Sequence, residues 1–94
     1  MKIMLPGALR SYAPQLQFEL PQAEALNAQG LCTLDSLFDA LDRRHPGLRF
    51  RVVDAQGLLR ANMRVFVNGL GVRDLQHALA AEDLVAVVLA LSGG

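Results

Sequence analysis

The stretch LVAVVLALSGG, residues 84–94, decides the fold, because it joins an apolar run directly to two glycines. Its first seven residues, LVAVVLA, are rich in valine and almost continuously apolar. This composition is typical of a central strand that is covered on both faces and can pair in parallel with a neighbour. We therefore expect a central strand that leads into a flexible tail at residues 91–94.

Two further strands are expected near the start of the chain. MKIML, residues 1–5, reads as a short strand that a Pro-Gly pair ends. QLQFEL, residues 15–20, alternates polar and apolar side chains, which predicts a half-buried strand. Joined by GALRSYAP, these strands predict a hairpin, and residues 21–30 are expected to form a surface loop.

One amphipathic helix is expected after this loop. Thr33 is a suitable N-cap, and Asp35 places a negative charge in the first turn, where it complements the helix dipole. The apolar side chains recur at helical spacing on one face: Leu34, Leu37, Phe38 and Leu41. Pro46 and Gly47 are expected to end the helix after His45.

The segments that follow the helix are expected to be mostly strand. LRFRVVD, residues 48–54, is read as a strand that a turn at AQG follows. MRVFVNG, residues 63–69, alternates apolar and polar side chains, and its Asn-Gly pair predicts a tight turn. VRDLQHAL, residues 72–79, is expected to form a short strand or one helical turn.

The expected order is strand, strand, helix, one or two strands and a final strand. If the last strand lies beside the first and parallel to it, the helix is the crossover that covers one face of the sheet. This order predicts an α+β fold of the β-grasp, or ubiquitin-like, type. We expect a mixed sheet of four to five strands with one main helix packed on one face.

The size and charge of the chain narrow the function classes. With 94 residues, the whole chain is expected to fold as one small domain, and its 52% of hydrophobic residues can bury a core. Nine basic and nine acidic residues cancel, which argues against a nucleic-acid-binding protein. Four arginines lie close together with Asp39 and Asp42 among them, which predicts a solvated charged face: Arg43, Arg44, Arg49 and Arg51.

The cellular compartment follows from the cysteine count and the start of the chain. Cys32 is the only cysteine, so no internal disulfide can form and a reducing compartment is expected. The apolar stretch in MKIMLPGALR is too short for a signal peptide, and no apolar run approaches the length of a membrane span. A cytoplasmic protein without a membrane partner is therefore expected.

No converging set of catalytic or metal-binding side chains is apparent in the sequence. His45 and His77 have no metal-ligand partner at a useful spacing, so no metal site is expected. Cys32 is expected to be a small buried hydrophobe, although the sequence leaves a Cys-His nucleophile pair open. NGLGVRD lacks the third glycine of a dinucleotide-binding fingerprint and is expected to be a turn.

The Gly93-Gly94 pair is the most informative local feature. Because glycine has no Cβ, two glycines can thread a narrow channel and bring a terminal carboxylate close to a nucleotide. A frayed end is the ordinary alternative, since disorder collects at termini. The diglycine favours a functional tail only in combination with the order of strands.

Four segments together resemble the ubiquitin-like sulfur carriers, over essentially the whole chain. This family includes the small subunit of molybdopterin synthase, the sulfur carrier of thiamine biosynthesis and the carrier of a cysteine-forming pathway. The resemblance rests on these segments in this order: ALR at residues 8–10, TLDSLFDALDRRHPGL at residues 33–48, VFVNG at residues 65–69 and LAAEDLVAVVLALSGG at residues 79–94.

The resemblance implies a protein cosubstrate and not an enzyme in its own right, with no bound cofactor. A ubiquitin-activating-type adenylyltransferase would use ATP to adenylate Gly94, and sulfur from a persulfide donor would replace AMP to leave a thiocarboxylate. Gly93, Ser92 and Leu91 would form the arm that carries this sulfur to a second enzyme. That acceptor would be the large subunit of molybdopterin synthase, a thiazole synthase or a cysteine-synthase-like enzyme.

Two departures from the family pattern leave the pathway open. Ala81-Glu82-Asp83 stands where the family often has Asp-Gly-Asp, and Leu89-Ala90 stands where molybdopterin-type members usually have two prolines. LRSYAP and DAQGLLRANMRVFVN look closer to the cysteine-pathway carriers and to unassigned carriers. Two other functions also remain open: a protein modifier joined through Gly94 to lysines of its targets, and an interaction domain whose diglycine is incidental.

The partner-binding surface is expected to be an exposed apolar patch near the base of the tail. The candidates are Val88 on the final strand, Phe66, and Leu58 or Leu59. Phe66 must face away from the valines on either side of it. The sheet face that the helix covers therefore decides whether Phe66 lies in the core or on the surface.

Overall fold

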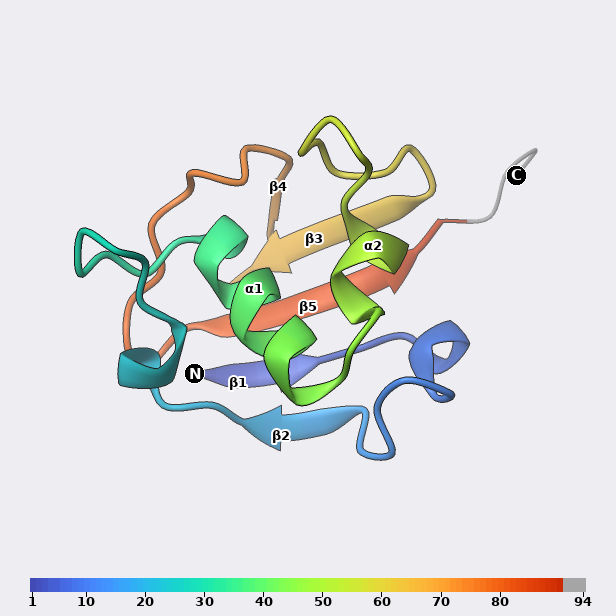
Figure 1. The fold of residues 1–94 in the computed structure, drawn as a ribbon, viewed down its shortest axis with the longest axis horizontal. Coiled ribbons are helices and arrows are strands. Elements are labelled where there is room, and N and C mark those ends of the chain that lie inside the picture. The colour runs from blue at the N-terminus through green and yellow to red at the C-terminus, as the bar shows by residue number, and fades with distance from the viewer. Residues whose placement is uncertain (91–94) are drawn as a thin grey trace.

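The computed structural model describes residues 1–90 and shows a mixed sheet with one main helix packed across one of its faces (Figure 1). The strands are β1 (Lys2–Met4), β2 (Gln17–Glu19), β3 (Met63–Val67), β4 (Leu70–Val72) and β5 (Leu84–Leu89). The helices are the short 3₁₀ helices η1 (Gly7–Leu9) and η2 (Gln22–Ala25) and the α-helices α1 (Leu34–Arg44) and α2 (Leu48–Val52). The five strands lie in the order β2-β1-β5-β3-β4, which confirms the expected β-grasp arrangement.

The central position of β5 is confirmed, but the expectation that both of its faces are covered is wrong. β5 runs parallel to β1, with Ile3 opposite Val85, and antiparallel to β3. Val85 and Val87 are buried under the helices, whereas Leu84 and Val88 are exposed. Successive side chains of a strand point to opposite faces, and α1 and α2 cover only one face. The apolar run therefore places every second β5 side chain on an open surface.

The main helix α1 begins and packs as expected. The Thr33 hydroxyl accepts a hydrogen bond from the Ser36 N–H at 3.1 Å, and the Ser36 hydroxyl accepts one from the Thr33 N–H at 2.8 Å. This reciprocal capping box satisfies two backbone donors that the first helical turn would otherwise leave unpaired. The four expected apolar side chains are fully buried against the sheet: Leu34, Leu37, Phe38 and Leu41.

The expectation of a strand at residues 48–54 is wrong, because residues 48–52 form the helix α2. Leu48 and Val52 are both fully buried and lie four residues apart, which is the spacing of one helix face. The turn into α2 uses Gly47 at φ 96°, a left-handed conformation that glycine adopts without strain. An Asp42 carboxylate oxygen accepts the N–H groups of Gly47 and Arg49, each at 3.1 Å, and so caps the new helix.

The turn signal at Asn68-Gly69 is confirmed, and the expectation for residues 72–79 is largely wrong. Asn68 at φ 52° and Gly69 at φ 84° connect β3 to β4 as a tight hairpin. Of residues 72–79 only Val72 belongs to a strand, and the rest form a loop with a turn at Asp74. The Asp74 side chain accepts the Gln76 N–H, so a local side-chain bond replaces regular pairing there.

Two smaller features complete the fold. The loop expected at residues 21–30 contains the 3₁₀ helix η2, whose Ala25 is fully buried beside α1. Within residues 1–90, no helix has both the length and the apolar character needed to cross a membrane.

Candidate functional site

The end of β5 is the place from which the predicted arm continues. Leu89 pairs with Met63 at the start of β3, and the Ala90 N–H donates to the Asn62 carbonyl oxygen at 2.7 Å. The chain is thus held in the sheet up to the last described residue. The other predicted site residues lie outside the described part of the chain: Leu91, Ser92, Gly93 and Gly94.

The face of the sheet away from the helices carries an apolar patch that includes two of the predicted docking residues. Phe66 is 36% exposed and Val88 is 42% exposed. We define the open sheet face by the residues Met4, Phe66, Leu84, Ala86 and Val88, which the strand register places on one side. The Phe66 ring lies across Gly71 of β4, 3.7 Å from the position that a Cβ would take there. Phe66 therefore belongs to the surface and not to the core.

Leu58 and Leu59 lie apart from this face. Leu59 is only 5% exposed and forms an isolated bridge with Val53, so it is a core residue and cannot belong to an exposed patch. Leu58 is exposed but lies in the turn after α2, where its N–H donates to the Asp54 side chain at 3.0 Å. The structure thus brings Phe66 and Val88 together on the open sheet face and leaves both leucines outside it.

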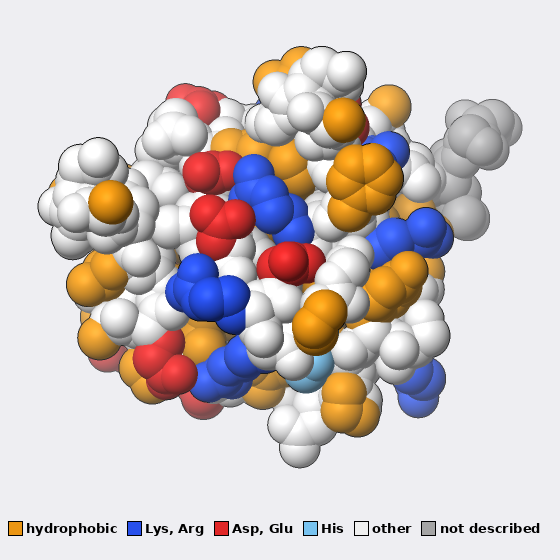
Figure 2. All heavy atoms as spheres, in the orientation of Figure 1, with side chains coloured by type: hydrophobic (Ala, Val, Ile, Leu, Met, Phe, Trp, Pro, Cys, Tyr) orange, Lys and Arg blue, Asp and Glu red, His pale blue; other side chains and the backbone are white. Residues whose placement is uncertain are grey.

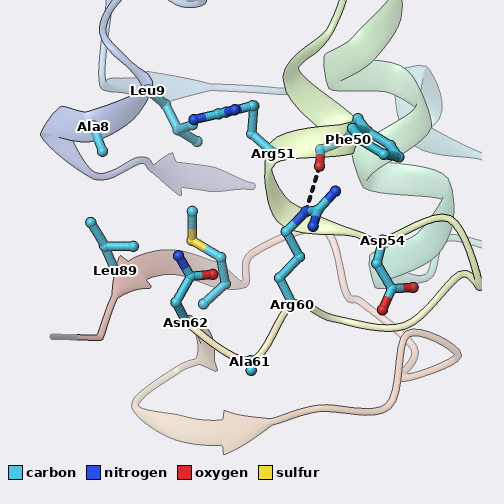
Figure 3. Close-up of a pocket in the computed structure, with 10 residues that line it drawn as sticks. Ala8, Leu9, Phe50, Arg51, Asp54, Arg60, Ala61, Asn62 and Leu89 are labelled. Carbon is cyan, nitrogen blue, oxygen red and sulfur yellow. Dashed lines mark hydrogen bonds between the residues drawn. The ribbon is translucent and has the colours of Figure 1, made fainter. Parts of the chain in front are cut away.

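A cleft that sequence reasoning missed lies beside the end of β5 (Figure 3). This β5-end cleft has a volume of about 560 Å³, and its lining includes Ala8, Phe50, Arg51, Arg60, Asn62 and Leu89. The Arg60 guanidinium lies 4.5 Å from the centre of the Phe50 ring, and its Nε donates to the Phe50 carbonyl oxygen at 2.6 Å. Reading residues 48–54 as a strand concealed the cleft, because the helical turn of α2 is what turns Phe50 and Arg51 outward.

The expected charged face lies over α1, where acidic and basic side chains intermix (Figure 2). Arg49 pairs with Asp35 at 2.7 Å and with Asp39 at 3.3 Å. Arg44 pairs with Glu24 at 2.9 Å. Arg44 and Arg49 thus form neutralised pairs on a solvated surface, which suits a charged face better than a phosphate site. Arg51 does not belong to this face: it has no ion pair within residues 1–90 and lines the β5-end cleft.

Cys32 is buried, as expected. Its Sγ lies 3.9 Å from the Met1 Sδ, and burial raises the pKa of the Cys32 thiol above its ordinary value of 9.0. Among residues 1–90, no three His, Cys, Asp or Glu side chains are grouped so that they could hold a metal ion. A buried thiol with a raised pKa is a poor nucleophile, because the reactive species is the thiolate.

Alkylation of Cys32 by iodoacetamide at pH 8 is therefore expected to be at least ~10-fold slower in the native protein than in urea. Burial blocks access and keeps the thiol protonated. Since the folded-state pKa is raised, this group stabilises the fold fully below pH 9.0, and that contribution is lost as the pH rises through the folded-state pKa. The rate of mass gain by intact mass spectrometry is the measurement, and equal rates in both states would show an accessible, reactive thiol.

Comparison with known proteins identifies relatives that span the whole chain. The sequence model of the ThiS family matches residues 3–94, and no curated protein matches. The crystal structure of SAMP1 from Haloferax volcanii is 30% identical, with a TM-score of 0.74, over 100% of this chain and 98% of that one.

Two other solved structures share the fold at lower identity. A chain of the Amycolatopsis orientalis BexX/CysO complex is 24% identical, with a TM-score of 0.79, over 99% of this chain and 98% of that one. Mycobacterium tuberculosis CysO is 23% identical, with a TM-score of 0.78, over 96% of this chain and 98% of that one. At these identities the likeness establishes the β-grasp architecture and nothing more specific.

Proposed function

Because this chain belongs to the ThiS family, we propose that it is a sulfur carrier whose Gly94 carboxyl group is converted to a thiocarboxylate for transfer to a second enzyme. The chain is a ubiquitin-like protein of the sulfur-carrier or modifier type. The observation that supports the thiocarboxylate at Gly94 is the family match itself. It extends through β5 to residue 94 and includes the Gly93-Gly94 pair.

The chemistry of the carboxyl group explains why a partner enzyme and ATP are needed. A free carboxylate is a poor electrophile, because its charge is delocalised and oxide is a poor leaving group. An oxygen of the Gly94 carboxylate attacks the α-phosphorus of ATP, and pyrophosphate leaves to give an acyl adenylate. The terminal sulfur of a donor persulfide then attacks the carbonyl carbon, and AMP leaves with the bonding electron pair. A thiol cleaves the remaining S–S bond, which leaves the thiocarboxylate on Gly94 and a disulfide on the donor side.

The residues of this chain supply position and not catalysis in the proposed reaction. Glycine at positions 93 and 94 lets the backbone pass a narrow channel, and Leu91 and Ser92 connect it to the sheet. ATP binds to the partner, so the carrier itself holds no cofactor. The chain acts as a protein cosubstrate in this proposal, which agrees with the buried and unreactive setting of Cys32.

Two classes of partner are proposed. The first is an adenylyltransferase of the ubiquitin-activating type, and the second is a sulfur-accepting enzyme related to the large subunit of molybdopterin synthase, to thiazole synthase or to cysteine synthase. A protein of the same fold forms the Amycolatopsis orientalis BexX/CysO complex, which supports docking of such a domain on a partner.

The turn before β5 has a structural role in this chain. Asp83 is the one residue of Ala81-Glu82-Asp83 that agrees with the family pattern. One of its carboxylate oxygens accepts the Ala80 N–H at 2.8 Å and the other accepts the Asn68 side-chain amide at 2.9 Å. The first bond closes the turn, and the second ties the start of β5 to the β3–β4 hairpin.

The open sheet face is the proposed docking surface for the partners. Its apolar residues are partly exposed and share the face with Lys2 and Arg64, and Val88 lies only two residues before Ala90, where the described chain ends. Covering apolar surface is worth ~25 cal/mol per Å², so a partner that grips this face gains affinity while the reactive end enters its active site.

Replacement of Phe66 and Val88 by Asp is expected to raise the KM for the carrier by about 30-fold in the adenylation reaction, which corresponds to ~2 kcal/mol of lost docking energy. The kcat should change little, because neither side chain reaches the reacting carboxyl group. The measurement is pyrophosphate release at varied carrier concentration. Leu31→Asp, at an exposed apolar residue outside the open sheet face, is the control and should leave the KM within about twofold. An unchanged KM for the double variant would show that the partner does not dock on the open sheet face.

The direct test of the proposed function is reconstitution of sulfur loading. The purified chain is incubated with ATP, a sulfide or persulfide donor and the activating enzyme of the same organism, and its intact mass is measured. The expected result is a mass gain of one sulfur-for-oxygen exchange that depends on ATP. A carrier that consumes ATP with this enzyme but never gains sulfur would contradict the proposal.

A protein modifier is the second candidate function, and a named relative favours it. The 30%-identical Haloferax volcanii protein SAMP1 is a small archaeal modifier protein. The same acyl adenylate at Gly94 would then pass to a lysine amine of a target and form an isopeptide bond. Lys2 is the only lysine of this chain, so polymers linked through its own lysines would have one linkage type. Immunoblots of cell lysates distinguish the two, because a modifier gives a ladder of higher-mass bands and a sulfur carrier gives only the free form.

A further inference from the structure

The β5-end cleft gathers cations that other described residues do not neutralise. Arg51 and Arg60 line it, and within residues 1–90 the arginine ion pairs are those of Arg44 and Arg49, on the charged face over α1. Two more arginines bond to backbone beside the cleft: Arg64 donates to the Ala61 carbonyl oxygen at 2.6 Å, and Arg73 donates to the Leu59 carbonyl oxygen at 3.0 Å. The end of the sheet from which the reactive arm leaves is therefore positively charged, although the whole chain is neutral.

The acidic group in the cleft does not cancel this charge. Asp54 contributes the carboxylate of the lining, and one of its oxygens accepts the N–H groups of Gln56 and Leu58 at 2.9 and 3.0 Å. Its carboxylate thus holds the turn after α2 and forms no ion pair with Arg51 or Arg60 in the structure. At least one positive charge of the cleft is left for an external anion.

The cleft also offers a held aromatic surface. Phe50 is 58% exposed, which is unusual for a phenylalanine on a helix of a folded protein. The hydrogen bond from Arg60 to the Phe50 carbonyl oxygen and the stacking of its guanidinium on the ring fix both side chains before any partner arrives. Arg51 lies 5.8 Å from the centre of the Tyr12 ring, so its guanidinium is also oriented by an aromatic contact. Preorganised cations next to an apolar surface lose little entropy on binding.

From this geometry we infer that the β5-end cleft binds an acidic segment of the partner protein, with carboxylates on Arg51 and Arg60 and an apolar side chain against Phe50. The inference rests on the proposed function, because a partner that receives Gly94 must approach the end of β5, where Leu89 lines the cleft. The site is separate from the open sheet face. The β5-end cleft and the open sheet face would together hold the partner at two separate surfaces near the end of β5.

The experiment is a ¹⁵N NMR titration of the full chain with a capped peptide of sequence Glu-Asp-Phe-Glu-Asp-Glu at low ionic strength. A control peptide carries Gln and Asn in place of every Glu and Asp. The expected result is a set of shifts confined to the amides of Phe50, Arg51, Arg60, Ala61 and Leu89, seen only with the acidic peptide. The variant Arg51→Glu/Arg60→Glu should weaken binding at least ~10-fold, since like charges now face the peptide. Added salt should weaken binding to the wild type as well.

Two further variants keep the test clear of folding effects. Arg51→Gln removes one exposed charge that makes no hydrogen bond to the α2 backbone in the structure, and it should weaken binding several-fold with an unchanged spectrum elsewhere. Arg43→Glu, on the exposed end of α1, is the matched charge reversal and should leave binding unchanged. Equal shifts with the neutral peptide, or no shifts with either peptide, would overturn the inference. Equal shifts with AMP or inorganic phosphate would also overturn it, because the cleft would then be a site for small anions.

Failure of this inference and failure of the proposed function are distinguishable. The titration needs no activating enzyme and no modification at Gly94. If the chain binds the acidic peptide but never gains sulfur, the cleft inference holds and the sulfur-carrier proposal fails. If the chain gains sulfur but does not bind the peptide, the sulfur-carrier proposal holds and the cleft inference fails.

Discussion

Removal of Gly93 and Gly94 is expected to abolish the sulfur-for-oxygen mass gain completely, while the free energy of unfolding stays within about 0.5 kcal/mol of that of the full chain. The truncated chain ends at Ser92, so its carboxylate falls short of the partner's active site by about 7 Å, at ~3.5 Å per residue. A misplacement of only ~1 Å at a reacting centre can lower a rate ~100-fold, so a shift of this size leaves no measurable reaction. The measurement is intact mass after incubation with ATP, sulfur donor and activating enzyme.

A control of the same length distinguishes the effect of a shortened arm from the effect of a changed residue at the reacting carboxyl group. Gly94→Ala keeps the number of residues but adds a Cβ next to the reacting carbonyl, which would crowd the narrow channel that the proposal requires. We expect this variant to load sulfur slowly and the truncated chain not to load it at all. The opposite outcome, a truncated chain that gains the same mass at the same rate as the full chain, would place the reactive group elsewhere in the protein.

Replacement of Phe38 by Ala is expected to destabilise the fold by about 3–5 kcal/mol, a large share of the ~5–15 kcal/mol that holds a domain together. Phe38 is the largest fully buried side chain and lies on the face of α1 that packs against the sheet. Its removal leaves a cavity between helix and sheet and also loses the transfer free energy of the ring. The measurement is urea unfolding followed by circular dichroism.

Phe50→Ala is the matched control, because it removes the same side chain from an exposed position. Phe50 contacts Arg60 but buries little apolar surface, so its removal is expected to lower the free energy of unfolding by less than about 1 kcal/mol. Similar losses for the two variants would mean that the core is not organised around α1 as the structure has it.

Sequence periodicity predicts an element correctly where the local pattern fits only one kind of secondary structure. The helix at Leu34–Arg44 has a clear cap at Thr33 and an apolar face at helical spacing, and the structure agrees with both. The Asn68-Gly69 turn is equally clear, because few residue pairs accept two positive φ values in succession. Valine-rich β5 is central as its composition predicts, although one of the two faces that the prediction takes to be covered is open.

The features that the sequence could not predict depend on contacts with residues from other elements of the fold. In residues 48–54 the apolar side chains fit both a strand and a helical turn, and the Asp42 cap that decides for the helix comes from a neighbouring element. The apolar sequence of β5 is the same whether one face of the sheet or both are covered. The exposure of Val88 could therefore be known only from the position of α1. The β5-end cleft joins α2 to the segment before β3, and no local pattern signals such a long-range pairing.

The location of sulfur on the protein as it is isolated from its own cells tests the central claim most directly. Trypsin cleaves after Arg10, Arg43 and Arg73, so residues 74–94 and residues 11–43 fall into different peptides, the first with Gly94 and the second with Cys32. Our account predicts that mass spectrometry under non-reducing conditions finds one sulfur in place of one oxygen on the Gly94 end of peptide 74–94. Sulfur found instead as an added atom on Cys32 in peptide 11–43, removable by dithiothreitol, would contradict it.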